Sequence, residues 1–278
     1  MDKNRTIIKA DGTVEPFKWD KFERSLARSH ASDFLVEKLK SKLDRTLPEM
    51  VSTDNLRTKV HSYLRKHQPY SAARYGIREA LMKLGPSGYG FEHFISQIFN
   101  TLGYHTNVGA IMQGKCVSHE IDVMASKDDS VDLMECKFHN TFGVKSDVKV
   151  ALYVHSRFLD LREAWDQNGV QGKVFGYGWL VTNTKLTDDA YAFAVCRGVK
   201  VLSWNQPDEN SLRQLIATTR LIPITALHSL SSMQHEILIN MGIVTCQQLL
   251  KADPEMLKSL NKDKVQDACN ESVNLIDS

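Results

Sequence analysis

The sequence predicts an α/β protein in which a mixed sheet, covered by helices, follows a basic, mostly helical segment and precedes a small helical one. Three observations predict this. Residues 1–85 carry 18 Lys and Arg against 11 Asp and Glu, whereas the rest of the 278-residue chain carries 17 against 22. Strand-like and helix-like patterns alternate between residues 104 and 204. From residue 209 onward, all patterns are helical.

The basic first segment begins with a predicted hairpin and continues as helices. Its strands, residues 6–9 and 13–17, flank Asp11-Gly12, a pair that tolerates the positive φ angles of a tight turn. Apolar residues at three- and four-residue spacing predict the helices 21–30, 34–47, 53–66 and 70–84. The positive charge suits a phosphate-bearing partner, although a solvated basic surface without a partner has the same composition.

Three glycines and a proline within residues 85–90 predict a linker, and the α/β segment begins there. An apolar helix follows at 91–102, and Gly103 is suited to end it. The later patterns predict strands at 104–108, 120–125 and 131–138, then a helix at 147–164, a strand at 175–182, a helix at 187–197 and a strand at 199–204. We therefore expect three domains, at residues 1–85, 86–207 and 208–278.

No apolar run approaches the roughly 18 residues of a membrane-spanning helix, and the first residues lack the apolar core of a signal peptide. We therefore expect a cytoplasmic protein without membrane contact. The cysteines are odd in number, scattered and never in a CxxC pair, which argues against a disulfide framework and a zinc site. They are Cys116, Cys136, Cys196, Cys246 and Cys269.

Charged residues gather on one face of two predicted neighbouring strands. Successive side chains of a strand point to opposite faces, so Glu135 and Lys137 share a face, and so do Glu120 and Asp122. If the strands pair through the turn at 126–130, Asp122 lies across from Glu135. Taken singly, these residues are better explained as surface charges at strand ends, with Glu135 and Lys137 forming a weak ion pair.

Together, the same residues suit hydrolysis of a phosphodiester. That reaction needs a nucleophilic water and a partner for developing negative charge, and a hard divalent cation serves both needs. Mg²⁺ is held by one or two carboxylates plus waters, which Asp122 and Glu135 can supply. Lys137 can orient the water or stabilise negative charge, and Glu92, in the first turn of the helix after the linker, is a candidate third carboxylate.

The order of these motifs resembles the Mrr-like restriction endonucleases of the PD-(D/E)xK superfamily. The resemblance covers residues 89–204 and rests on G-x-G-F-E, I-D-V, E-C-K, W-L-V-T-N, L-T-D-D-A and C-R-G-V-K-V-L, in that order. It implies a restriction-endonuclease-like mixed sheet and DNA as the substrate. By the same resemblance, Asp122, Glu135 and Lys137 are catalytic, Glu92 assists, and Mg²⁺ or Mn²⁺ binds to Asp122, Glu135 and Glu92.

The sequence departs from the family pattern in two places. Cys136 occupies the middle of E-x-K, and no Gln-x-x-x-Tyr follows, since that region holds Lys145, Lys149 and Tyr153. Substrate positioning therefore cannot be carried over from the family. His119 and His139 flank the same strands and fit either a contact with the scissile phosphate or, more simply, ordinary edge positions.

The first segment resembles the ATP-cone, a nucleotide-sensing module. The resemblance extends through residue 84 and rests on I-I-K-A-D-G-T at 7–13, E-P-F at 15–17 and A-A-R-Y-G-I-R at 72–78. It implies ATP or dATP as an allosteric ligand. Lys and Arg side chains at strand and helix ends, with one hydroxyl, then form the expected triphosphate site. These residues are Lys9, Lys21, Thr53, Arg57, Arg74 and Arg78.

Alternatives remain open for the two flanking segments. The usual Lys-Arg pair of the module is here Lys9-Ala10, and a basic helical domain that binds the DNA backbone would use the same side chains. Arg74 and Arg78 also fit an oligomer interface. The tail resembles a helix-hairpin-helix module with a turn at Gly242, but the expected Gly-hydrophobic-Gly grip is absent. It fits DNA contact, protein packing or a stabilising cap.

The function expected from these observations is a nucleotide-regulated, metal-dependent DNA endonuclease, and the resemblance implies a role in restriction or defence. The alternative is a non-catalytic, nucleotide-sensing DNA-binding regulator. Cutting both strands normally requires two sites, so we expect a homo-oligomer, at least a dimer.

Overall fold

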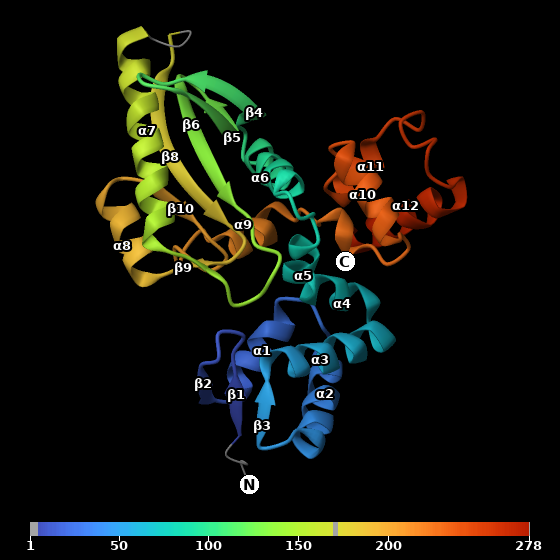
Figure 1. The fold of residues 1–278 in the computed structure, drawn as a ribbon. Helices are drawn as coiled ribbons and strands as arrows, with labels where there is room; N and C mark the ends of the chain where they lie inside the picture. Colours follow the sequence, from blue (N-terminus) through green and yellow to red (C-terminus); the bar gives the residue numbers. More distant parts are fainter. Residues whose placement is uncertain (1–4, 169–171, 278) are drawn as a thin grey trace.

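The computed structural model of the chain, described here for residues 5–168 and 172–277, confirms the predicted fold class. Figure 1 shows an N-terminal part at the bottom, a five-stranded sheet with its helices at the upper left, and the C-terminal helices at the right. We call these the N-terminal part (residues 5–84), the sheet part (residues 89–202) and the C-terminal part (residues 212–277). Within the described residues, no helix is long and apolar enough to cross a membrane.

The N-terminal part combines a small sheet with helices. The predicted hairpin forms, and a third strand that the sequence did not predict pairs in parallel with β1, giving the order β2-β1-β3. The last predicted helix is two helices separated at Gly76, where an added Cβ would lie 3.3 Å from His61 Nε2. The elements are β1 (Thr6–Ile8), β2 (Val14–Pro16), α1 (Trp19–Ala27), α2 (Asp33–Thr46), β3 (Met50–Ser52), α3 (Thr53–His67), α4 (Pro69–Tyr75) and α5 (Ile77–Met82).

The sheet part is built on five strands in the order β10-β8-β6-β5-β4. β4, β5 and β6 form the antiparallel meander predicted from the sequence, and β6, β8 and β10 are parallel. The elements are α6 (Tyr89–Thr101), β4 (His105–Gln113), β5 (Ser118–Lys127), β6 (Ser130–Lys137), β7 (Lys145–Ser146), α7 (Val148–Asn168), β8 (Val174–Thr182), β9 (Lys185–Leu186), α8 (Asp188–Cys196) and β10 (Lys200–Leu202). β7 and β9 pair with each other in a separate two-stranded ribbon.

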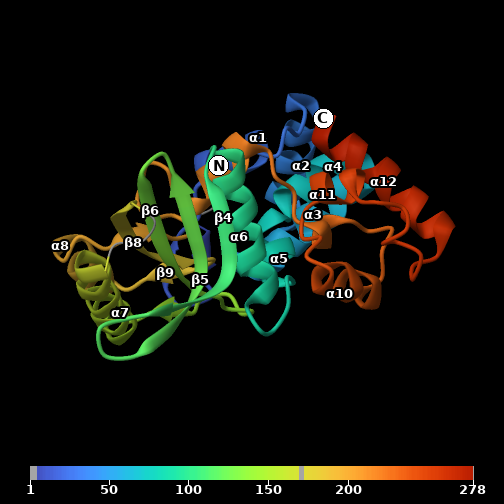
Figure 2. The ribbon, with the colours of Figure 1, turned by 90° about the horizontal axis from the view of Figure 1, so that it is seen from above.

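Helices cover both faces of this sheet, as Figure 2 shows from above. α6 buries Phe91, Phe94 and Ile98 against one face, and α7 and α8 pack against the other. Because each helix buries an apolar stripe, the sheet becomes the middle layer of an α/β sandwich. The predicted carboxylates lie in the middle of β5, near the end of β6 and in the first turn of α6, which the layers hold close together.

The strand β5 changes its relation to the core at Asp122. Regular alternation along a strand would put Ile121 and Val123 on one face, but Ile121 packs in the cluster beneath α7 whereas Val123 packs in the cluster beneath α6. The pairing of β5 with β4 skips Asp122, opposite Gly109 at φ +68°, and its pairing with β6 begins only at Val123. This irregularity removes Asp122 from the regular ladder, so its carboxylate is free to accept a hydrogen bond from β6.

The C-terminal part is helical, as predicted, but it has no separate core. One continuous buried cluster contains Val123 and Val181 of the sheet part together with Leu212, Leu238 and Leu275. Thr225 also donates a 2.6 Å hydrogen bond to the carbonyl of Ala80. The elements are α9 (Leu212–Thr219), η1 (Ile224–Ala226), α10 (Ser232–Asn240), α11 (Cys246–Lys251) and α12 (Lys262–Asp277). The C-terminal part therefore connects the other two parts.

Candidate functional site

The four predicted nuclease residues lie on three neighbouring elements. Asp122 belongs to β5, Glu135 and Lys137 belong to β6, and Glu92 lies in the first turn of α6. Gly88, at φ +85°, precedes α6 and accepts the backbone N–H of Glu92 at 3.0 Å. The side-chain periodicity of the strands and the glycine at the helix start together bring the four residues to one place.

Glu135 is neutralised by two cations. Its side chain is 7% exposed, one carboxylate oxygen lies 2.5 Å from Lys137 Nζ, and the other accepts a hydrogen bond from Arg157 of α7. The second terminal nitrogen of Arg157 donates to the carbonyl of Glu120. Arg157 was not predicted from the sequence. It lies one helical turn after Tyr153, and its guanidinium and the Lys137 ammonium both lie within 6 Å of the Tyr153 ring centre.

Asp122 and Glu92 are held in a different electrostatic state. Asp122 accepts a 2.6 Å hydrogen bond from the backbone N–H of Cys136, while burial and the nearby Glu135 carboxylate raise its pKa to about 6. Burial, and then the negative charges of Asp122, Glu120 and Glu135, raise the pKa of Glu92 to about 7. Carboxylates that repel one another in a partly buried place are an arrangement that a cation stabilises.

The carboxylates of Asp122 and Glu92 are the right type of ligand for a hard divalent cation, but two is the smallest number that would hold it. Among residues 5–168 and 172–277, no three His, Cys, Asp or Glu side chains are grouped closely enough to hold a metal ion. Asp122 and Glu92 repel each other, which fits two carboxylate ligands completed by waters. Glu135 would join them only by exchanging contacts with Lys137 or Arg157. The metal role of these residues stays a prediction.

The two flanking histidines have ordinary structural contacts. His119 Nε2 lies 2.8 Å from Asp160, which also accepts the backbone N–H of Cys116 and so fixes the β4–β5 turn against α7. The side chain of Asn183 holds His139 in place: it accepts a hydrogen bond from the backbone N–H of His139 and donates one to its carbonyl. Burial lowers the pKa of His139. These contacts favour the simpler of the two interpretations given above.

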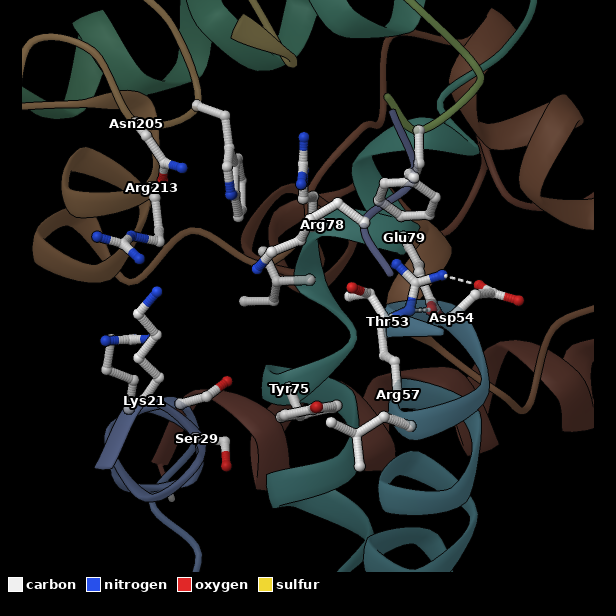
Figure 3. A pocket seen from close by; sticks show the side chains of 18 of the residues that line it. Lys21, Ser29, Thr53, Asp54, Arg57, Tyr75, Arg78, Glu79, Asn205 and Arg213 are labelled. Atoms are coloured by element: carbon white, nitrogen blue, oxygen red, sulfur yellow. Dashed lines mark hydrogen bonds and ion pairs between the residues drawn. The ribbon is translucent and has the colours of Figure 1, made fainter. Parts of the chain in front are cut away.

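The predicted nucleotide residues line a second site, a cavity of about 1210 Å³. The cavity lies between the N-terminal part, the loop after β6 and the helix α9 (Figure 3). Its lining includes all the side chains expected to bind the triphosphate: Lys9, Lys21, Thr53, Arg57, Arg74 and Arg78. The structure thus brings together residues from β1, α1, α3, α4 and α5, although their binding role stays a prediction.

Several of these predicted residues are already paired with acids. Lys9 and Lys21 both contact Glu15, at 2.9 and 3.1 Å. Arg57 contacts Asp54 at 2.8 Å and Glu79 at 2.6 Å. We call the neighbourhood of Arg57, Asp54 and Glu79 the carboxylate end of the cavity. Figure 3 shows it opposite Arg213 and Lys21.

Other cavity cations have no acidic partner. Within the described residues, no ion pair is formed by Arg28 at the C-cap of α1, Arg78 of α5, Arg213 of α9 or Arg220 at the C-cap of α9. Sequence reasoning included Arg78 and missed the other three. No local signal could have found them, because the cavity exists only when α9 packs beside the N-terminal part. We call the neighbourhood of Arg28 and Arg213 the arginine end of the cavity.

A loop after the E-C-K strand joins the two sites. Residues 138–144, the bridging loop, run from β6 to β7. The Phe142 ring centre lies 3.9 Å from the Arg57 guanidinium, and Lys145 lies 3.7 Å from Asp11. A Cβ added to Gly143 would lie 2.9 Å from the carbonyl oxygen of Ala10. The nucleotide cavity therefore touches the segment that directly follows Lys137.

Comparisons with known protein families match two parts of the chain, one near each end. Residues 5–78 match the model of the ATP cone domain, which confirms that resemblance, and residues 222–276 match the model described as AF1548-like, C-terminal. The structure described as MspJI restriction endonuclease in complex with a 27-mer oligonucleotide is 13% identical, over 62% of this chain and 36% of that chain, with a TM-score of 0.36. That similarity is too low to carry an argument, so the Mrr-like resemblance stays a prediction.

Two relatives are more similar. An uncharacterized protein of Archaeoglobus fulgidus is 33% identical over 166 residues, which make up 60% of this chain and 89% of the relative. A crystal structure described as the protein of unknown function AF1548 is 31% identical, covers 68% of this chain and 98% of its own, and has a TM-score of 0.58. The chain therefore belongs to the AF1548-like family and carries an ATP cone domain at residues 5–78.

Proposed function

We propose that this protein is a nucleotide-regulated, divalent-metal-dependent nuclease that hydrolyses phosphodiester bonds in DNA. The observation that carries the proposal is the grouping of Glu92, Asp122, Glu135 and Lys137, in which desolvation and mutual repulsion raise the pKa of Asp122 to about 6 and that of Glu92 to about 7. Partly buried carboxylates with perturbed pKa values beside an ammonium group are typical of a functional site.

Asp122 and Glu92 would hold the cation, and Glu135 would join them on release from one of its two cations. A bound Mg²⁺ or Mn²⁺ would supply charge neutralisation at the phosphate and a more acidic water. The protein's own side chains would orient the attacking water and stabilise negative charge. Lys137, whose side chain is 34% exposed, can donate to the attacking water or to a phosphate oxygen. Arg157, which contacts Glu135 and the carbonyl of Glu120, would position the Glu135 carboxylate.

The nucleotide part of the proposal rests on the ATP cone domain and its cavity. ATP or dATP would bind there, and the bridging loop would carry the effect to β6, because Phe142 and Gly143 contact the N-terminal part while Lys137 lies at the other end of the same segment. A ligand shifts such an equilibrium only through different affinities for two arrangements of the loop. The direction of the effect, activation or inhibition, is open to measurement.

One observation favours the second candidate, a nucleotide-sensing DNA-binding regulator without catalysis. Both oxygens of Glu135 are taken by Lys137 and Arg157, so the carboxylate has no free oxygen for a metal in this arrangement. A cleavage assay separates the two candidates. A DNA-binding regulator would retard the same DNA on a gel without cutting it.

The test uses supercoiled plasmid, Mg²⁺ or Mn²⁺, and the full chain. Asp122→Ala and Lys137→Ala should lose nicking and linearisation, whereas Asp129→Ala should keep them, since Asp129 is an exposed carboxylate in the turn between the same two strands. Equal activity in the wild type and in both site variants would rule out this metal site. Absence of cleavage in the wild type with either metal, together with DNA retardation, would favour the regulator.

The nucleotide part has its own test. Calorimetric titration with ATP and dATP should give binding to the wild type and much weaker binding to the double variant Lys9→Ala/Lys21→Ala. A variant at Lys251, an exposed residue at the end of α11, serves as a control for lost positive charge. Cleavage assays with and without the nucleotide then report whether binding activates or inhibits.

A further inference from the structure

Some of the cationic side chains that line the cavity form ion pairs with acids, and others do not. At the carboxylate end, Arg57 is held between Asp54 and Glu79 at 2.8 and 2.6 Å. At the arginine end, Arg28 at the C-cap of α1 and Arg213 of α9 line the same cavity, and in the described part of the chain neither forms an ion pair. A polyanion entering the cavity would therefore meet acids at one end and unpaired guanidinium groups at the other.

Guanidinium groups of the N-terminal part and of α9 and its C-cap line one cavity on the two sides of the boundary between the parts, and among them Arg74 also donates to the Leu275 carbonyl at 3.0 Å. Burial and then the positive charge of Arg213 lower the pKa of Arg28. Burial and the charge of Arg220 lower the pKa of Arg74, so a second pair spans the same boundary. Arg nearly always stays charged, so facing arginines without an anion destabilise the arrangement that holds them together.

Arg78 lies between the two ends of the cavity and also has no anion from the described residues in contact with its guanidinium. Its guanidinium lies 5.1 Å from the Phe142 ring centre and 5.2 Å from that of Trp204, its Nε is buried without a hydrogen-bond partner, and Figure 3 shows it in the middle of the cavity. Burial, and then the charge of Arg57, lower its pKa to about 10. Two aromatic faces partly offset the loss of water, but no carboxylate replaces it.

We propose that the phosphate groups of a nucleoside triphosphate bind at the arginine end of the cavity, held jointly by Arg28 of the ATP cone domain and by Arg213 of α9. This inference rests on the nucleotide binding proposed above and extends it, because Arg213 lies outside residues 5–78, the part that matches the ATP cone model. Guanidinium groups bind phosphate oxygens in pairs of hydrogen bonds, so two facing arginines match one triphosphate chain.

The carboxylate end fits the other half of such a ligand. Asp54 and Glu79 would repel phosphates but accept hydrogen bonds from ribose hydroxyls or a base amino group. The opposed ends therefore give the ligand one orientation, with its phosphates toward α9. At about 1210 Å³ the cavity has room for the whole molecule, since pockets for small ligands measure about 300–1000 Å³.

A ligand shared in this way stabilises one arrangement of the parts. Leu212 and Ile216 of α9 are buried in the same cluster as Val181 and Leu202 of the sheet. Phosphates bound between Arg28 and Arg213 would replace repulsion with attraction at this boundary, so the ligand would hold α1 against α9. Regulation would then depend on contacts outside the ATP cone domain.

The experiment measures binding of ATP and of inorganic tripolyphosphate to the full chain by calorimetry, together with the melting temperature without ligand. Arg213→Ala should weaken the binding of both probes by about tenfold or more, the usual effect of losing one charged hydrogen-bonded contact. Arg213→Glu should weaken binding further, yet raise the ligand-free melting temperature, because Glu would attract Arg28. A residue with only a structural role would not change the two quantities in opposite directions.

Arg197→Ala and Arg197→Glu are the matched controls, since Arg197 is an exposed C-cap arginine of α8 that does not line the cavity. Both should leave binding unchanged. Unchanged affinity in Arg213→Ala and Arg213→Glu, with affinity lost in Lys9→Ala/Lys21→Ala, would overturn the shared site and leave nucleotide binding by the ATP cone domain intact. No binding of either probe to the wild type would overturn both. Both measurements, the binding affinity and the melting temperature, are independent of whether the protein cleaves DNA.

Discussion

The two polar sites of this protein differ in how their charges are balanced. At the end of β6, acids predominate, yet Glu135 has two cations in contact and Asp122 has a backbone donor. In the cavity, cations predominate, and Arg28 and Arg213 have no acid in contact within the described residues. The difference fits the proposals made above, a small cation at the first site and a polyanion at the second. It also predicts that substitutions at the two sites affect separate functions.

The largest expected effect breaks the first site and leaves the second intact. Asp122→Asn removes a charge while keeping the shape of the side chain, so cleavage should fall by about 10²–10³-fold, as when one group that stabilises transition-state charge is lost. ATP affinity should stay unchanged, because Asp122 does not line the cavity. Plasmid cleavage rates and calorimetry on the same preparation measure both. A loss of ATP affinity as large as the loss of cleavage would contradict the assignment of Asp122 to the carboxylate site alone.

The next prediction concerns the balance around Glu135. Arg157→Ala leaves a carboxylate that is 7% exposed with Lys137 as its remaining cation, so the free energy of unfolding should fall by about 1–3 kcal/mol. Chemical denaturation followed by circular dichroism measures this. Arg162→Ala is the control on the same helix: Arg162 is exposed and its guanidinium lies 4.8 Å from the Phe175 ring centre. Equal destabilisation by both variants would mean that the ion pair with Glu135 contributes nothing specific.

A third prediction tests whether the two sites communicate. Gly143, at φ +86°, lies where a Cβ would come within 2.9 Å of the Ala10 carbonyl oxygen. Gly143→Ala should therefore displace the bridging loop from the N-terminal part and reduce the effect of nucleotide on cleavage, while basal cleavage persists. The measurement is the ratio of cleavage rates with and without ATP.

Gly198→Ala is the matched control for that prediction. Gly198 also has a positive φ, +73°, but an added Cβ would meet no atom within 4 Å. It should cost about 1–2 kcal/mol from backbone strain alone and leave the nucleotide effect unchanged. If Gly143→Ala keeps the full nucleotide effect, the bridging loop is not the connection between the sites.

The carboxylate site could be predicted from the sequence because its geometry is mostly local. Strand periodicity alone places Glu135 and Lys137 on one face, and a short turn brings Asp122 beside them. The irregularity at Asp122 was not predicted, since it depends on a positive φ at Gly109 in the neighbouring strand. Arg157 was missed for a related reason, because its partner is chosen by how α7 packs on the sheet.

The cavity was predictable only on its ATP cone side. Lys9, Lys21 and Arg57 follow from motifs within one segment, whereas Arg213 enters through the packing of α9. β3 was also missed, because three residues are too few to show a periodic pattern. The predicted boundary at residue 207 follows a change in pattern, but the buried cluster continues across it through Leu202 and Leu212. Sequence patterns report elements, and only packing decides which elements share a core.

The smallest expected effect comes from a contact between two histidines. Unlike the arginines of the cavity, histidines can lose their positive charge near neutral pH. The rings of His61 in α3 and His228 in the C-terminal part lie 6.0 Å apart, centre to centre. Burial lowers the pKa of both, as do their positive neighbours Arg65 and Lys83, while Glu79 beside His61 and Glu271 beside His228 act in the opposite direction. The two histidines therefore remain neutral in the folded protein to lower pH than in the unfolded chain.

The sign of the pH dependence follows from that difference. Below the ordinary histidine pKa of 6.5, the unfolded chain binds more protons than the folded one, so stability falls as pH falls from 6.5 through the lower folded-state pKa values. The two histidines should therefore lower the melting temperature between about pH 7.5 and pH 5.5, by about 2–4 °C for each kcal/mol lost, whereas Asp122 and Glu92, whose pKa values are raised, act in the opposite direction over the same range. His228→Gln should reduce this drop, whereas His105→Gln, on the exposed strand β4, should not. An identical drop in both variants would mean that the contact between α3 and the C-terminal part does not sense protons.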